Sequence, residues 1–265
     1  MEKEKQGVYS ALILDDERPI LNSLMGALKR RGFITWGTEN PEDAIRFVET
    51  HRPSVACVDL HMPKVNGIEV IKRMRQIIPD IRVIAVTAYL STYQADIEEL
   101  KVRVVVKGSQ TNRELEAVIC EELALSQQEF AAIKTRKKTK LKLRVLFVDD
   151  EWEAADFNKE IVITEGMEAE SAHSPAEALE KAKSFQPNVV CTDLKMQNMN
   201  GDELIKRMKD SGEYPFVKLY VALTGFSHEK EGLFEAGAAE VLTKPCGMSE
   251  FMEALGRWAA LVEKA

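Results

Sequence analysis

The sequence repeats itself about halfway along the chain, and this repeat constrains the fold more than any other feature. When the 265 residues are shifted by 134 positions, residues of the two halves match in order. The matches are Asp15-Asp16-Glu17 with Asp149-Asp150-Glu151, Gly32 with Gly166, Pro41 with Pro175, Cys57, Asp59 and Leu60 with Cys191, Asp193 and Leu194, Gly67 with Gly201, and Ile71 to Met74 with Ile205 to Met208. Because solenoid repeats have only about 20–50 residues, this repeat indicates a tandem duplication of a whole domain.

Beyond these matches the offset becomes 137, so that Thr87 meets Thr224 and Lys107 meets Lys244. We therefore expect three extra residues in the second copy, near Ser211 to Tyr214.

The charge is distributed unevenly, and it indicates where the two copies join. Residues 126–144 carry seven basic residues and one acidic residue, whereas the net charge is −2 over residues 1–125 and −11 over residues 145–265. We predict a first domain over residues 1–125, a basic helical linker over residues 126–143 and a second domain over residues 144–265.

Three interpretations of the basic linker stay open. It can be solvated and continue a long helix from Leu115 through Leu123 and Phe130, or it can dock on the acidic second domain. It can also bind nucleic acid, but it lacks interleaved aromatic residues and a neighbouring helix-turn-helix pattern, so nucleic acid is not expected as a partner.

Each copy alternates short apolar runs with amphipathic stretches. The runs are rich in β-branched residues, which is typical of buried parallel strands. They are residues 11–14, 33–36, 55–58, 83–86 and 102–106 in the first copy, and 145–148, 168–172, 189–192, 219–223 and 240–242 in the second. Asn40-Pro41 and Ser174-Pro175 are suited to begin helices. Five β–α units per copy predict two α/β domains with a doubly wound, flavodoxin-like (βα)5 fold, each with three layers around a central parallel five-stranded sheet.

Polar residues interrupt the apolar pattern where the strands end. They are Asp15, Asp16, Asp59, Thr87 and Lys107 in the first copy, and Asp149, Asp150, Asp193, Thr224 and Lys244 in the second. The carboxyl ends of parallel strands meet at one edge of the sheet, where sites in such folds lie. Three carboxylates there repel one another unless a hard divalent cation, Mg²⁺ or Mn²⁺, neutralises them. A cation, a lysine, a hydroxyl donor and a carboxylate nucleophile together suit the transfer of a phosphoryl group.

With these residues, both copies resemble the CheY-like receiver domain of bacterial two-component response regulators, over nearly the whole chain except the linker. The resemblance rests on the acidic pair, on an Asp-Leu-x-Met run followed by glycine eight residues after the aspartate, and on the threonine and the lysine. It implies that Asp59 and Asp193 accept a phosphoryl group from the phosphohistidine of a histidine kinase or of a histidine phosphotransfer protein.

The resemblance also implies the roles of the neighbouring residues. Asp16 and Asp150 would ligate Mg²⁺ directly, Asp15 and Asp149 would act largely through water, and the backbone carbonyls of His61 and Lys195 would complete the ligands. Thr87 and Lys107, like Thr224 and Lys244, would contact the phosphoryl oxygens, and their movement would signal phosphorylation to the face formed by the fourth helix, the fifth strand and the fifth helix.

The sequence departs from the family at a few positions. Gly108 follows Lys107 where the family usually has a proline in a cis bond, whereas Lys244-Pro245 keeps the usual form. Val104 and Val241 replace an aromatic switch residue. His61 and Lys195, with Tyr89 and Phe226, lie at positions that tune the phosphoryl lifetime in this family.

We therefore expect a cytoplasmic response regulator that is a phosphoacceptor rather than an enzyme, with output by contact with a downstream protein or by phosphoryl relay. No apolar run is long enough to span a bilayer or to form a signal-peptide core. One alternative is that one receiver, more readily the first, is an unphosphorylated docking module or forms a homodimer; another is that the chain is the regulatory portion of a larger regulator. A Mg²⁺-dependent phosphohydrolase is a further alternative, but such enzymes have an aspartate where this chain has His61 and Lys195.

Overall fold

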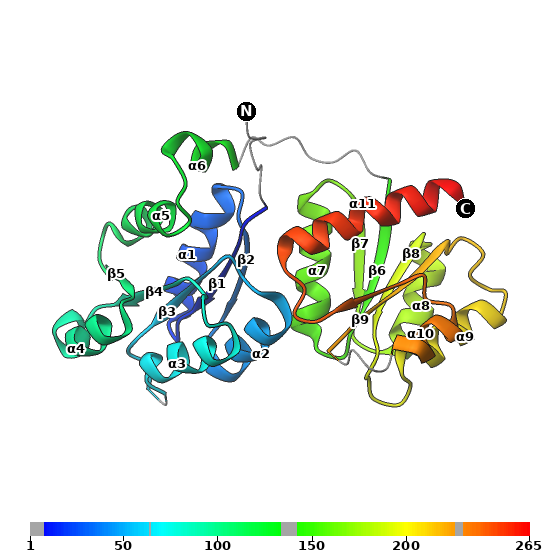
Figure 1. Cartoon of the computed structure of the whole chain (residues 1–265), viewed down its shortest axis with the longest axis horizontal. Coiled ribbons are helices and arrows are strands. Elements are labelled where there is room, and N and C mark those ends of the chain that lie inside the picture. The colour runs from blue at the N-terminus through cyan, green and yellow to red at the C-terminus, as the bar shows by residue number, and fades with distance from the viewer. Residues whose placement is uncertain (1–7, 64, 134–141, 226–229) are drawn as a thin grey trace. The chain divides into compact units, whose positions relative to one another are not determined.

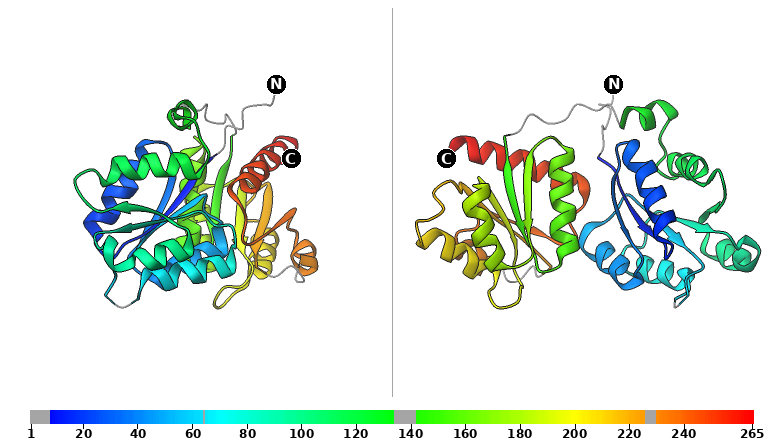
Figure 2. Two further views of the ribbon diagram at one scale, coloured as in Figure 1. Left: turned by 60° about the vertical axis from the view of Figure 1, so that its left-hand side comes forward. Right: turned by 180° about the vertical axis from the view of Figure 1, so that it is seen from behind.

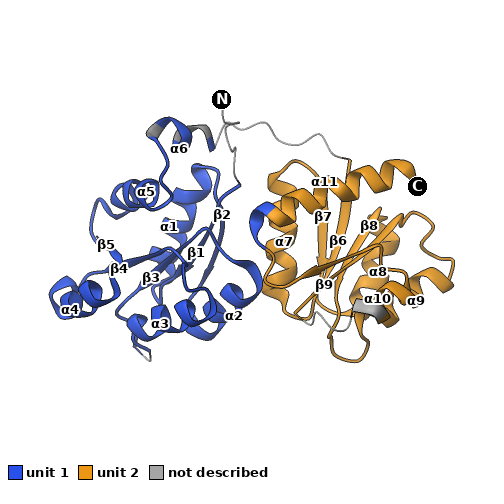
Figure 3. Cartoon of the chain, viewed as in Figure 1, with its two compact units in different colours: residues 1–136, 247–249 blue, residues 137–246, 250–265 orange. Residues whose placement is uncertain are grey.

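The computed structural model describes residues 8–63, 65–133, 142–225 and 230–265 of the chain. The chain divides into two compact units, residues 1–136 with 247–249 and residues 137–246 with 250–265, which follow the two copies of the repeat except at residues 247–249 (Figure 3). Within the described residues, no helix is both long enough and apolar enough to cross a lipid bilayer.

The first unit alternates strands and helices (Figure 1). Its strands are β1 (Ser10–Leu14), β2 (Ile34–Thr38), β3 (Val55–Asp59), β4 (Val83–Thr87) and β5 (Arg103–Val106). Its helices are α1 (Arg18–Arg30), α2 (Pro41–His51), α3 (Gly67–Ile77), α4 (Leu90–Leu100), α5 (Thr111–Glu122) and α6 (Gln127–Ile133). The five strands form one parallel sheet in the order β2-β1-β3-β4-β5.

The second unit has the same arrangement. Its strands are β6 (Arg144–Val148), β7 (Glu168–Ala172), β8 (Val189–Asp193), β9 (Leu219–Thr224) and β10 (Glu240–Thr243). Its helices are α7 (Trp152–Thr164), α8 (Pro175–Phe185), α9 (Gly201–Asp210), α10 (Lys230–Ala236) and α11 (Met248–Lys264). The parallel sheet has the order β10-β9-β8-β6-β7, so β6 has the position in this sheet that β1 has in the first. These two sheets confirm the predicted fold class.

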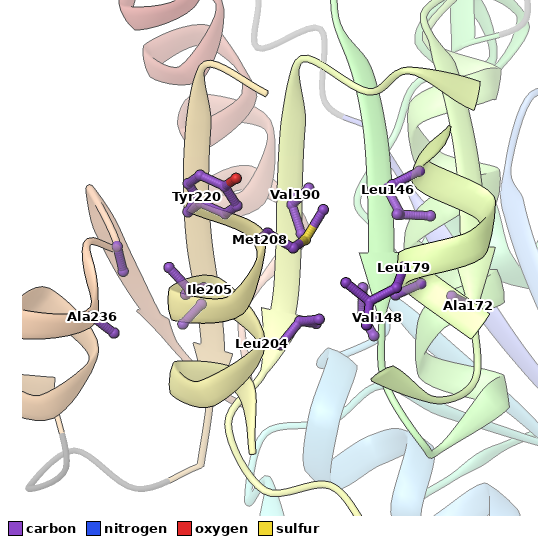
Figure 4. Close-up of a cluster of buried hydrophobic side chains, with 14 of the residues drawn as sticks. Leu146, Val148, Ala172, Leu179, Val190, Leu204, Ile205, Met208, Tyr220 and Ala236 are labelled. Carbon is purple, nitrogen blue, oxygen red and sulfur yellow. The ribbon is translucent and has the colours of Figure 1, made fainter. Parts of the chain in front are cut away.

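Helices cover both faces of each sheet (Figures 1 and 2). In the second unit, apolar residues of β6 and β8 pack against α8, α9 and α10; Leu146, Val190, Leu204 and Met208 belong to this cluster (Figure 4). On the other face, Phe147 of β6 contacts Phe251 of α11, and Phe251 contacts Trp258. Each sheet is therefore buried on both sides, which explains why its strands are nearly continuous apolar runs.

Several local predictions are confirmed. Asn40 Oδ1 accepts a hydrogen bond from the Glu42 N–H at 3.0 Å, and Ser174 Oγ accepts one from the Glu177 N–H at 3.2 Å, so both residues cap helices that begin with proline. The connection between α9 and β9 has eight residues, against five between α3 and β4, which places the three extra residues where the sequence predicted them. Cys57 and Cys191, which match in the repeat, are both buried free thiols.

The prediction of one long helix from Leu115 through Phe130 is wrong. Helix α5 ends at Glu122, and Ala124 then adopts a left-handed conformation with a φ of 52°. A new helix begins after Ser126, whose N–H donates to Glu129 Oε2 at 2.7 Å, while the Glu129 N–H donates to Ser126 Oγ at 3.2 Å. This reciprocal pair is a capping box, and it starts α6 independently of α5.

Helix α6 packs on the first unit. Phe130 and Ile133 are buried in the same apolar cluster as residues of α1 and α5, and the Phe130 ring lies 5.8 Å from that of Phe33, centroid to centroid. Phe33 immediately precedes β2, so α6 covers the amino-terminal end of the sheet, away from the edge where the strands carry Asp59 and Thr87. The basic residues Lys134, Arg136, Lys137, Lys138 and Lys140 lie outside the described residues.

The glycine that follows each phosphoacceptor candidate by eight residues has a steric role. A Cβ atom on Gly67, the first residue of α3, would overlap the backbone carbonyl oxygen of Asp59. A Cβ atom on Gly201, the first residue of α9, would overlap the carbonyl oxygen of Asp193 in the same way. Glycine thus allows each of these helices to begin directly against the end of the strand that carries the aspartate.

We predict that Gly201→Ala destabilises the second unit by about 1–3 kcal/mol, because a fixed backbone oxygen cannot rotate away from the new methyl group. The matched control is Gly256→Ala in α11, where a Cβ atom would meet nothing within 4 Å. That change is expected to stabilise the unit by about 0.5–1 kcal/mol, since alanine is the better helix residue. Urea unfolding of both variants checks the prediction, and equal effects of the two substitutions would contradict it.

Candidate functional site

In the first unit, the polar residues predicted from the strand ends meet at the carboxyl edge of the sheet. Lys107 Nζ lies 2.9 Å from Asp15 Oδ2 and 2.8 Å from Asp59 Oδ2, so one ammonium group bridges two carboxylates. Thr87 is fully buried at the end of the neighbouring strand, and its carbonyl oxygen accepts the Lys107 N–H at 2.9 Å. This backbone bond holds the start of the lysine side chain beside the threonine.

The same cluster exists in the second unit. Lys244 Nζ lies 2.7 Å from Asp149 Oδ2 and 2.7 Å from Asp193 Oδ1, and the Lys244 N–H donates to the Thr224 carbonyl at 2.8 Å. Thr224 is buried at the end of β9. The duplicated sequence has therefore kept both the residues and the ion pairs.

Backbone N–H groups fix the second oxygen of each bridged carboxylate. Asp59 Oδ1 accepts the His61 N–H at 3.0 Å, and Asp193 Oδ2 accepts the Lys195 N–H at 2.8 Å. In the same way, the Glu17 N–H donates to Asp15 Oδ1 and the Glu151 N–H donates to Asp149 Oδ1, both at 3.0 Å. Each bond links an aspartate to the residue two positions later, which orients the carboxylate toward the lysine.

Burial and the ion pairs shift the pKa values of these groups. Burial raises the pKa of Asp15 and of Asp59 above the ordinary aspartate value, and the positive charge of Lys107 only partly offsets it. Burial also disfavours the charge of Lys107 itself, but its ion pairs with Asp59 and Asp15 outweigh this effect and raise its pKa. The two acids and the lysine thus stabilise one another as a charged cluster in a poorly solvated place.

Asp149 shows the largest shift among the aspartates. Burial raises its pKa to about 6, against the attraction of Lys244 and with a further contribution from the charge of Asp193. The pKa of Lys244 is raised by Asp149 and Asp193, which overcome the cost of its burial.

The carboxylates of the first unit fit a hard divalent cation. Asp15, Asp16 and Asp59 each offer an oxygen, and these oxygens lie within 4.8 Å of one another. Asp15 Oδ2 is shielded from solvent and makes no hydrogen bond of good geometry, despite its closeness to Lys107 Nζ. A donor set made only of carboxylate oxygens suits Mg²⁺ or Mn²⁺.

The sequence did not predict some of the contacts at these sites. Glu17 Oε1 lies 3.3 Å from Lys107 Nζ, and its only sequence signal was its place after the acidic pair. His61 Nδ1 lies 3.1 Å from Tyr93 Oη, and the His61 ring lies 4.3 Å from that of Tyr89. In the second unit, the Gln197 N–H donates to Asp150 Oδ2 at 3.2 Å.

The remaining predicted positions are placed as follows. The Lys244–Pro245 bond is cis, as the resemblance implied. Val104 is half-buried in β5 and Val241 is half-buried in β10. Phe226 lies outside the described residues.

The raised pKa of Asp149 predicts a pH dependence of stability. Because the folded chain binds the proton more tightly than the unfolded chain, whose aspartate pKa is about 3.9, protonation stabilises the fold. This stabilisation is lost as the pH rises through about 6. In the presence of a chelator, we expect the second unit to gain about 1 kcal/mol between pH 7.5 and pH 5, relative to the Asp149→Asn variant. Native-state hydrogen exchange of β8 amides measures this difference, and a difference that does not change with pH would contradict the raised pKa.

Both units match a known protein family. Residues 11–119 and 145–256 both match the response regulator receiver domain family. The chain is 31% identical over 80 residues to the photosynthetic apparatus regulatory protein RegA of Cereibacter sphaeroides, which covers 30% of this chain and 44% of that protein. It is 37% identical over 78 residues to the sporulation initiation phosphotransferase F of Bacillus subtilis, which covers 29% of this chain and 63% of that protein. The matches thus span about half the length of these curated relatives.

Solved structures include similar single domains. The chemotaxis response regulator CheY4 of Vibrio cholerae is 28% identical, with a TM-score of 0.41, over 44% of this chain and 98% of that chain. A CheY-like receiver domain protein of Methanospirillum hungatei is 28% identical, with a TM-score of 0.42, over 47% of this chain and 98% of that chain. Since the family match covers most of both units, the chain belongs to the response regulator receiver domain family and carries two receiver domains in tandem.

Proposed function

We propose that both receivers accept a phosphoryl group, the first on Asp59 and the second on Asp193. The observation that carries this proposal is the lysine that bridges two carboxylates at the carboxyl edge of each sheet, both buried in the first unit and one buried and one half-buried in the second. A buried carboxylate next to a cation and a hydroxyl group is a suitable nucleophile for phosphoryl transfer. The presence of the same ion pairs in both units supports assigning the activity to both rather than treating the first as a docking module.

The donor in this proposal is the phosphohistidine of a histidine kinase or of a histidine phosphotransfer protein. A carboxylate oxygen of Asp59 forms a bond to phosphorus while the bond between phosphorus and the imidazole nitrogen breaks. The electron pair of that bond goes to the nitrogen, so a donor ring that carries a proton on its other nitrogen leaves as neutral imidazole. The product on the receiver is an acyl phosphate.

The residues around Asp59 have distinct roles in this step. Lys107, which now contacts Asp59 Oδ2, would pair with a phosphoryl oxygen and offset its negative charge. Thr87 Oγ1 accepts the Tyr89 N–H at 3.0 Å, so its own hydroxyl proton can be donated to another phosphoryl oxygen. Lys244 and Thr224 would act in the same way on Asp193.

Asp16 and Asp150 would hold Mg²⁺ directly, with Asp15 and Asp149 contributing through water and with the phosphoacceptors and the carbonyls of His61 and Lys195 completing the set. A bound divalent cation neutralises the negative charge that the carboxylates and the phosphoryl oxygens share. The three converging carboxylates of the first unit support this assignment.

We assign the receivers to residues 1–125 and 144–265, joined by the linker over residues 126–143, whose α6 packs back on the first receiver. The protein would act in the cytoplasm, where its phosphodonors are found, and would have no turnover beyond its own phosphorylation and dephosphorylation. Phosphorylation would shift an equilibrium between two arrangements of the α4–β5–α5 face, or of its counterpart in the second unit, toward the one that a downstream protein binds.

The test uses the full chain, Mg²⁺ and a small-molecule phosphodonor, with phosphorylation sites located by mass spectrometry. We expect the wild type to be modified at Asp59 and Asp193, the variants Asp59→Asn and Asp193→Asn to be modified only at the remaining aspartate, and the double variant to be unmodified. Asp80→Asn, which changes an exposed aspartate before β4, is the control and should behave as the wild type. Wild-type protein that is modified at neither aspartate would overturn the proposal.

A further inference from the structure

The two receivers differ at one position of the loop that follows the phosphoacceptor. The first has Pro63 after Met62, and the second has Gln197 after Met196, at the same offset of 134 that aligns the acceptors. Proline has no backbone N–H, whereas glutamine has one. The second loop can therefore donate a hydrogen bond from a place where the first loop cannot.

This N–H is used in the second receiver. The Gln197 N–H donates to Asp150 Oδ2 at 3.2 Å, so the loop between β8 and α9 is attached to the acidic pair that follows β6. Asp150 is the residue that would ligate the cation directly under the proposed function. In the first receiver, its counterpart Asp16 makes no hydrogen bond to any residue that the structure describes.

The three aspartates of the site are also arranged differently in the two receivers. Oxygens of Asp15, Asp16 and Asp59 lie within 4.8 Å of one another, ready to share one ion. Among the described residues of the second unit, Asp149, Asp150 and Asp193 do not form such a group. The lysine bridges are alike in the two units, so they do not account for this difference.

From this we propose that the Gln197 N–H lowers the affinity of the second receiver for divalent cations, so that the first receiver binds Mg²⁺ at lower concentrations. This inference rests on the proposed function, since it takes the acidic pairs as cation ligands. The hydrogen bond holds the Asp150 carboxylate in an orientation in which it does not group with Asp149 and Asp193, so the carboxylate has to turn, and lose this bond, before all three can share one ion. Binding of Mg²⁺ to the second receiver then releases the loop at residues 194–200, a consequence that the first receiver lacks.

The proposed effect depends on the backbone N–H of Gln197 and not on its side chain. The residue is exposed, and the hydrogen bond to Asp150 comes from its main-chain nitrogen. Gln197→Ala therefore keeps the interaction and is the matched control, whereas Gln197→Pro removes it.

The affinity of each site can be measured in the full chain by titration calorimetry with Mg²⁺. Asp16→Ala silences the first site so that the second can be measured, and Asp150→Ala does the reverse. We expect the first site to bind about three- to tenfold more tightly, the range that corresponds to the net contribution of one hydrogen bond of ordinary strength. Adding Gln197→Pro to Asp16→Ala should recover most of this factor, and adding Gln197→Ala should change nothing.

A second measurement needs no substitution in the loop. In wild-type protein with a chelator, hydrogen exchange by NMR should show the Gln197 amide protected, and saturating Mg²⁺ should accelerate its exchange. The Lys244 amide, which donates to the Thr224 carbonyl, should stay protected in both conditions.

The results separate this inference from the proposed function. Equal affinities of the two sites, an equal effect of the alanine and proline variants, or a Gln197 amide unprotected without Mg²⁺ would each overturn the inference while leaving the proposed function intact. Absence of Mg²⁺ binding at both sites would overturn the proposed function itself.

Discussion

Lys107 lies between two buried carboxylates and Lys244 lies between a buried and a half-buried one, and the site of each receiver depends on this pairing. A carboxylate without a partner at the end of a buried strand would lose its hydration with no compensation. One lysine satisfies two of them, and a single N–H from the residue two positions later holds the other oxygen of each. The carboxyl edge of each sheet can therefore hold two adjacent negative charges that would otherwise repel each other.

This pairing depends on backbone features some distance away. Lys107 is held beside Thr87 by a main-chain hydrogen bond, so the lysine follows the position of β4. Gly67 and Gly201 let the following helix begin against the carbonyl of the acceptor, which keeps the loop short and its N–H in place. The raised pKa values of Asp15, Asp59 and Asp149 reflect first their burial and then the repulsion between neighbouring aspartates, because the cluster still carries more negative than positive charge. Such a site favours the binding of a group that brings positive charge. Once that charge is present, the lysine can pair with an oxygen of an incoming phosphoryl group.

The sequence predicted those parts of the structure that depend on short-range pattern or on strand order. Strands could be placed because both faces of each sheet are buried, and Asp15, Asp59, Thr87 and Lys107 could be brought together because parallel strands align their carboxyl ends. Contacts that depend on loop conformation could not be predicted. The His61–Tyr93 pair joins residues from different loops and helices, and the Gln197–Asp150 bond requires a particular bend after β8. The break between α5 and α6 did have a local signal, Ser126 followed by Glu129, but the surrounding apolar spacing favoured one continuous helix.

A crystal structure of the full chain with Mg²⁺ and fluoroberyllate, a phosphoryl analogue, tests the central claim most directly. The account predicts the analogue on a carboxylate oxygen of Asp59 and of Asp193, with Lys107 and Lys244 contacting its fluorine atoms and the acidic pairs holding the cation. Fluoroberyllate bound elsewhere, with both lysines still bridging the same carboxylates, would contradict it.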